Sequence, residues 1–216
     1  MLFLTNKYQS GTISSDDLFY AWNAEQKAYI GDLLGNWHNR NNTKTGNNIG
    51  MIEDRRIRTI IAPFTITDGI DIVSSVIAKP DDFLYLLSMR IGADENPVFE
   101  INTDQISSVS KSVIDAPSED TGTYYYYQIQ NNFILLPSVV DGIVNMDYIA
   151  NPRDIVWNYT YDTDGREVYS ASGSVQPLWG DLEIIEITKR TLSSLGVRFT
   201  SQDFENFGKT AIATGD

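Results

Sequence analysis

The stretch at residues 132–152, NFILLPSVVDGIVNMDYIANP, constrains the fold most, because much of it follows the two-residue period of β-strands. An apolar run at 133–136 stops at Pro137, and Val144, Met146 and Tyr148 then alternate with polar residues. Such alternation is typical of a half-buried strand. Asp141-Gly142 lies between the two runs, and glycine tolerates the positive φ of a tight reversal. We therefore expect a β-hairpin, with its second strand ending near Ile149.

The segments before this stretch extend the β pattern toward the amino terminus. Strand-like runs lie at 58–61, 64–66, 83–91 and 98–101, and residues 106–114 fit either a strand or a short helix. Four consecutive tyrosines at 124–127 place two rings on each face of a strand. Both faces must then be covered, either by the same chain or by a neighbouring copy. After Pro152, segments 155–161 and 166–170 flank an Asp-Gly turn and predict a second hairpin.

Helical patterns flank this β-rich middle. Residues 15–38 carry apolar side chains at helical spacing after a candidate N-cap at Ser14 or Ser15. A second stripe predicts a helix from about 178 to 195, closed by Gly196. Its members are Leu178, Leu182, Ile185, Leu192 and Leu195. A short helical segment is expected at 203–207, before a frayed tail.

The predicted fold class is therefore α+β, with amphipathic helices near both termini and a long antiparallel β-rich middle. Residues 1–50 hold the first helix and a polar loop at 39–50, residues 51–176 the β-rich region, and residues 177–216 the last helices and the tail. Because both helices need a partner for their apolar stripes, they are expected to pack on each other as one helical core, with the β region inserted between them.

The charge and composition exclude several functions. Asp and Glu total 29 against 16 Lys and Arg, a formal net charge of −13, which opposes general binding to nucleic acid or anionic membrane. The charge fits either a well-solvated surface or an acidic surface that lets DNA pass without adhering. The chain has no cysteine, which excludes thiolate nucleophiles and cysteine-based zinc sites. No apolar run approaches the roughly 20 residues that span a bilayer, so no membrane association is expected.

The residues that could carry chemistry do not form a catalytic set. His38 is the single histidine, beside Trp37 and an Asn-rich loop, and is expected to be a surface residue at a helix end. Asp162-x-Asp164-Gly165 is similar to part of a calcium loop, but it lacks the remaining ligand spacing and is more simply a hairpin turn. The carboxylate pairs Asp81-Asp82 and Glu119-Asp120 lie in turns. We therefore predict no catalytic, cofactor-binding or metal-ligating residue, and no enzyme.

The one basic cluster, Arg55, Arg56 and Arg58, stands beside Glu53 and Asp54. It is too small to be a nucleic-acid footprint in so acidic a chain. It is interpreted as a solvated edge, or as a source of salt bridges between subunits.

Three runs carry a resemblance to a known family. They are Lys79 to Leu86 (KPDDFLYL), Tyr126 to Leu136 leading into Pro137, and Asp147-Tyr148-Ile149 before Pro152, with 182–196 as a terminal helix. In this order, over residues 60–207, the chain resembles the head-to-tail connector, or neck ring, proteins of tailed bacteriophages, particularly of short-tailed and crAss-like phages.

The resemblance implies a structural virion protein without catalytic residues or cofactors. It would form a homo-oligomeric ring, typically twelve-fold, beneath the portal protein at the head-to-tail interface. There it would contact other neck or tail ring proteins and extend the DNA channel without reading DNA sequence.

Two alternatives rest on the residues themselves. The first is a non-catalytic β-rich module of a phage fibre or cell surface that binds carbohydrate or a receptor, suggested by aromatics such as Tyr125 and Trp157. The second is an enzyme restricted to carboxylate chemistry.

Overall fold

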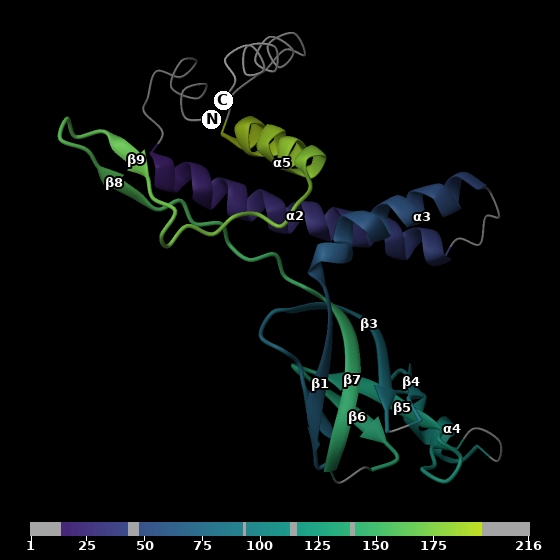
Figure 1. The fold of residues 1–216 in the computed structure, drawn as a ribbon. Coiled ribbons are helices and arrows are strands. Elements are labelled where there is room, and N and C mark those ends of the chain that lie inside the picture. Colours follow the sequence, from purple (N-terminus) through teal and green to yellow (C-terminus); the bar gives the residue numbers. More distant parts are fainter. Residues whose placement is uncertain (1–13, 43–47, 93, 113–115, 139–140, 196–216) are drawn as a thin grey trace. The chain divides into compact units, whose positions relative to one another are not determined.

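The computed structural model describes residues 14–42, 48–92, 94–112, 116–138 and 141–195. They belong to two compact units (Figure 1). The helical unit comprises Met1–Pro63 and Pro152–Asp216, and the barrel unit comprises Phe64–Asn151. The fold class is α+β, as predicted.

The barrel unit is a closed barrel in the order β1-β2-β6-β5-β4-β3-β7, in which β7 pairs back onto β1. Its strands are β1 (Thr65–Val73), β2 (Val76–Ala78), β3 (Phe83–Ile91), β4 (Asn96–Glu100), β5 (Tyr124–Ile129), β6 (Asn132–Leu136) and β7 (Asp141–Ala150). The sheet is mixed rather than purely antiparallel, because β4 and β5 are parallel. A parallel pair needs a long crossover, and here the connection contains the short helix α4 (Ile106–Ser110). The ambiguous segment at 106–114 thus begins as a helix.

The predicted hairpin at 132–152 is wrong, although both of its strands form. β6 pairs with β2 and β5, whereas β7 pairs with β1 and β3. Asp141 and Gly142 are not a turn, because they belong to β7 and lie opposite Val73 and Ile72. The alternation along a strand sets which face is buried, but it does not say which neighbour the strand pairs with.

The barrel interior is packed with alternate residues of its strands. Val144, Met146 and Tyr148 of β7 point inward and are at most 3% exposed, which confirms the predicted inner face of this strand. Phe133 of β6 meets Phe83 and Tyr126 edge-on, at ring-centroid distances of 5.6 and 5.3 Å. Full burial of one such side chain stabilises a fold by roughly 1.5–3 kcal/mol. The interior is therefore a filled core.

The helical unit contains α2 (Ser15–Asn42), α3 (Asn48–Ile61) and α5 (Asp181–Ser194), together with a two-stranded ribbon of β8 (Tyr159–Tyr161) and β9 (Glu167–Tyr169). A short 3-10 turn, η1 (Ala62–Phe64), follows α3. Ser14 is the N-cap of α2, since its hydroxyl accepts a hydrogen bond from the Asp17 N–H at 3.1 Å. α2 packs against α5, as expected, and Trp22 of α2 donates a hydrogen bond to Thr188 of α5 at 3.4 Å.

The predicted strand at 58–61 is wrong, because residues 48–61 form helix α3. Ile57 and Ile61, four residues apart, are buried, while Arg55, Arg56 and Arg58 are exposed, which is a helical pattern. Of the loop expected at 39–50, residues 39–42 belong to α2 and 48–50 to α3, and 43–47 lie outside the described residues. Gly196 and the helix expected at 203–207 also lie outside them.

The predicted core stripe of the last helix is wrong for most of its length. Leu192 is buried, but Leu178, Leu182 and Ile185 are 54%, 72% and 46% exposed. The other buried residues of the helix are Ile187 and Thr191, which the predicted stripe did not include. α5 carries apolar residues on two faces, and helical periodicity alone does not select between them.

Candidate functional site

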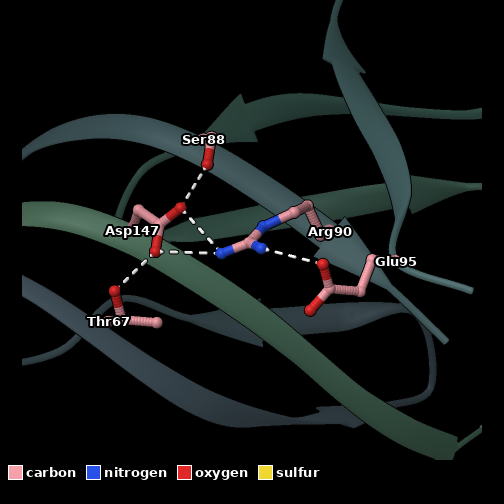
Figure 2. A network of polar contacts seen from close by, with 5 residues as sticks. All are labelled: Thr67, Ser88, Arg90, Glu95 and Asp147. Atoms are coloured by element: carbon pink, nitrogen blue, oxygen red, sulfur yellow. Dashed lines mark hydrogen bonds and ion pairs between the residues drawn. The ribbon is translucent and has the colours of Figure 1, made fainter. Parts of the chain in front are cut away.

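A charged cluster lies on the outer surface of the barrel, across strands β1, β7 and β3 (Figure 2). Asp147 points outward because its neighbours Met146 and Tyr148 point inward. Its carboxylate accepts hydrogen bonds from the hydroxyls of Thr67 at 2.7 Å and Ser88 at 2.6 Å. The Arg90 guanidinium reaches both carboxylate oxygens, at 3.2 and 2.9 Å, and also contacts Glu95 at 3.1 Å.

This cluster is a cross-strand brace that joins β1, β7 and β3. Burial alone would raise the pKa of Asp147, but the hydrogen bonds from Ser88 and Thr67, together with the Arg90 charge, outweigh it and lower the pKa. Both oxygens accept hydrogen bonds, which favours the ionised form of the carboxylate. Arg90 Nε is buried and has no hydrogen-bond partner within the described part of the chain.

A second polar cluster is buried in the helical unit around Gln26. This side chain is 1% exposed and lies within the apolar stripe of α2. Its amide NH₂ donates to the carbonyl of Arg153 and to Asn23 Oδ1, both at 3.0 Å, and its oxygen accepts from Trp179 Nε1 at 3.1 Å. Every hydrogen-bonding group of the buried amide therefore has a partner, as burial requires.

Asn23 completes this cluster by pairing with the backbone of Ile155. Its side-chain NH₂ donates to the Ile155 carbonyl at 3.1 Å, and its oxygen accepts from the Ile155 N–H at 2.8 Å. Asn23 and Gln26 thus hold the segment that follows Pro152 against α2. No titratable side chain takes part in these bonds.

The ribbon β8–β9 carries an aromatic ladder on one of its faces. Trp157 stacks on Phe19 of α2 at 5.8 Å with ring planes 8° apart, and its other neighbour is Tyr169 at 4.7 Å. Tyr159 lies opposite Tyr169 in the strand register, and its ring is 5.6 Å from that of Tyr161. The ribbon lies at the amino-terminal end of α2 (Figure 1). Although Phe19 anchors the base of the ladder, Trp157, Tyr169 and Tyr161 stay 41%, 42% and 65% exposed.

Another aromatic surface lies on the outside of the barrel, over β4, β5 and β6. Tyr126 points into the core, where burial, followed by the charge of Glu100, raises the pKa of its hydroxyl. Tyr125 points outward between Phe99 and Leu136, its register partners, and its ring lies 6.1 Å from that of Phe99, which is 53% exposed. The chain itself thus covers one face of the tyrosine run, whereas both faces were expected to be covered, by the same chain or by a neighbouring copy. The other face is an outward aromatic row.

The residues weighed for chemistry lie apart in the fold. His38 is within α2, and its side chain lies outside the description. Asp162 forms the predicted hairpin turn, in which its carboxylate accepts from the N–H groups of Asp164 at 2.9 Å and Arg166 at 2.8 Å.

The carboxylate pairs do not converge on a common site either. Asp82 accepts a hydrogen bond from the Tyr148 hydroxyl at 3.0 Å, and burial together with this carboxylate raises the pKa of Tyr148 to about 12. Glu119 and Asp120 are exposed in a separate turn. Among the described residues, no group of three or more His, Asp or Glu side chains could hold a metal ion.

Sequence reasoning missed both polar clusters. The sequence does indicate the cluster around Gln26, since this polar residue lies inside the apolar stripe between Trp22 and Ile30. It does not indicate the set around Asp147, because Thr67, Ser88 and Arg90 meet it only through the strand register.

No protein-family model matches the chain, and a search of curated proteins finds no match either. Among the helices in the described ranges, none combines the length and apolar character needed to cross a membrane.

Proposed function

We propose that the protein is a structural virion subunit that forms a ring in the portal-proximal head-to-tail connector of a tailed phage and extends the DNA channel. The observation that carries this proposal is that both units leave apolar or aromatic side chains exposed on separate faces. These faces are the β8–β9 ladder, the outer side of α5 and the outward row at Phe99 and Tyr125. A ring subunit needs at least two different contact faces toward its neighbours.

The resemblance to neck proteins supports the same role. Two of its three runs, at 79–86 and 126–136, cover the start of β3 and most of the β5–β6 pair, and the third lies in β7. The runs therefore belong to strands of the barrel, and the final segment includes α5. The net charge of −13 suits a wall past which DNA slides without adhering. On this proposal the ring is twelve-fold and contacts the portal and the adjoining neck proteins in the virion.

The test is assembly with the portal. The purified chain is mixed with the portal protein of the same virion, and the mass of the complex is measured by mass photometry and its shape by negative-stain imaging. A ring of many copies on the portal is the expected result. A chain that stays monomeric and ignores the portal at tens of micromolar would overturn the proposal.

The outward row at Phe99 and Tyr125 favours one second candidate, a β-rich module that binds carbohydrate or a receptor. Exposed rings on a sheet offer a platform for the apolar faces of sugars, although these two rings are tilted by 47°. Glycan-array binding by the full chain that is lost in Tyr125→Ala, but kept in the exposed barrel variant Val73→Ser, would support it. An array without any signal would remove this candidate.

A further inference from the structure

The ribbon β8–β9 has the features of an arm that is completed by another molecule. It has three residue pairs, Tyr159↔Tyr169, Thr160↔Val168 and Tyr161↔Glu167, and within the described ranges neither strand pairs with a third. A two-stranded sheet of this size is marginal in water without a covering surface. The outer end of its aromatic face nevertheless stays exposed, up to 65% at Tyr161.

The outer stripe of α5 is a second exposed surface in the same unit. Leu182 and Ile185 lie on one side of the helix, and the exposed Leu178 precedes the helix in the chain. The opposite side is buried through Ile187 and Thr191. α5 thus buries one face against its own unit and carries a second, apolar face on its outer side. Such an exposed apolar face is typical of a helix that a partner covers.

The charges of the two surfaces are complementary at one end of α5 only, because this helix begins with the acidic residues Asp181 and Glu183 and carries Lys189 in its later half. The turn of the ribbon carries Asp162, Asp164 and Glu167 against Arg166, an acidic excess. The outer stripe of α5 continues one turn beyond Ile185 to Lys189, which is exposed. The arm and the stripe therefore match in apolar area, and their charges favour the orientation that places the acidic turn at the Lys189 end, away from Asp181 and Glu183.

We propose that the β8–β9 ribbon of one subunit docks on the outer stripe of α5 of a second copy, with its acidic turn toward Lys189. This inference rests on the proposed ring and names its subunit joint. Because the two surfaces are different, the contact is heterologous, and each subunit can give its arm to one neighbour and receive the arm of another. Such a contact repeats around a closed ring.

The absence of cysteine allows a direct test, because a single thiol introduced into this sequence is the only thiol in the chain. Glu167→Cys marks the aromatic face of the ribbon opposite Tyr161, and Ser193→Cys marks the α5 stripe one turn after Lys189. Both positions are exposed. The two single variants are mixed before assembly, and a short bismaleimide is added to the assembled protein. The expected product is a covalent dimer that contains one copy of each variant. The double variant should give a ladder of multiples.

A substitution in the stripe provides the second arm of the test. Leu182→Glu should weaken assembly about tenfold or more, as loss of a central interface anchor does, while its melting temperature stays within a few degrees of wild type. Tyr20→Glu is the matched control, since Tyr20 is an 81% exposed residue of α2, and it should assemble normally.

The outcomes separate this inference from the proposed function. A wild-type chain that forms no ring with the portal overturns the proposed function. A ring that forms without a cross-link between the Glu167→Cys and Ser193→Cys subunits, or in which Leu182→Glu assembles like wild type, overturns the subunit joint alone. Cross-linking of the α5 thiol to the portal, and not to a second copy, also overturns it, because the occupant of the stripe would then be the portal.

Discussion

The two units stabilise their polar side chains in opposite ways. In the helical unit, Gln26 is neutral, 1% exposed, and saturated with hydrogen bonds. In the barrel, Asp147 and Arg90 are charged, and their side chains stay 22% and 31% exposed at the outer surface. A buried amide needs only hydrogen-bond partners, whereas a buried charge also needs its lost hydration replaced. The depth of each site therefore matches the chemistry placed there.

The largest effect is expected in the barrel core, which contains neither kind of polar cluster. Tyr148→Ala should lower the free energy of unfolding by about 3–5 kcal/mol, because it removes a buried ring and leaves a cavity. Tyr148→Phe, which loses only the hydrogen bond to Asp82, should lower it by about 1 kcal/mol. Urea unfolding measures both values. Near-wild-type stability of Tyr148→Ala would contradict the inward assignment of this side chain.

The next effect belongs to the buried neutral cluster. Gln26→Met keeps the length of the side chain but removes the hydrogen bonds that Gln26 makes with Trp179 Nε1 and the Arg153 carbonyl. The free energy of unfolding of the helical unit should fall by about 2–3 kcal/mol, the penalty of leaving buried polar groups unsatisfied. Thermal unfolding followed by tryptophan fluorescence reports on the helical unit, because all four tryptophans of the chain belong to it. A melting temperature equal to that of the wild type would show that the amide of Gln26 is dispensable.

The charged cluster should have a smaller effect that depends on pH. The pKa of Asp147 is lowered in the folded state, so its contribution is present above the unfolded pKa of about 3.9 and is lost as pH falls through the lower folded pKa. Asp147→Asn should therefore cost about 1–2 kcal/mol at pH 7, and the difference from wild type should shrink toward pH 3. Asp71→Asn, an exposed change on β1, is the control. A difference that stayed constant across this pH range would argue against the ionised brace.

The smallest effect is expected at the surface of α2, next to Gln26. Lys27 contacts Asp154 at 2.7 Å, but the two side chains are 48% and 57% exposed. Lys27→Met should change the free energy of unfolding by about 0.5 kcal/mol or less, because solvent screens such a pair. It is also the matched control for Gln26→Met, since it introduces the same side chain one position along the helix. A loss as large as that of Gln26→Met would break the contrast between buried and exposed polar contacts.

The sequence predicted elements better than it predicted their partners. Val144, Met146 and Tyr148 identified a strand and its inner face, since alternation depends only on which side meets the core. It could not show that β7 pairs with β1 and β3, because pairing is decided by residues far away in the chain. The same limit hid the cluster around Asp147, whose other members come together only through that register and the turn after β3.

The wrong predictions in the helical unit, for α3 and for the buried face of α5, have a different cause. The run that ends at Ile61 contains Ile57, Ile60 and Ile61, and so short an apolar run fits a strand or a helix equally well. In α5, Leu182 and Ile185 form as good a stripe as Ile187 and Thr191, and tertiary packing selected the second. Gln26 alone could have been found, as a polar residue in the middle of an apolar stripe.

The register at the start of the barrel has a consequence for how such a chain can change over time. Thr65, next to the point where the chain enters this unit, pairs with Ile149, next to the point where it leaves. Neighbouring strands are about 5 Å apart, so the span Phe64–Asn151 behaves as a cassette with adjoining ends. Recombination could exchange it for another domain of that kind while the flanking helices keep their own backbone intact. The barrel and the helical unit can therefore diversify independently of each other.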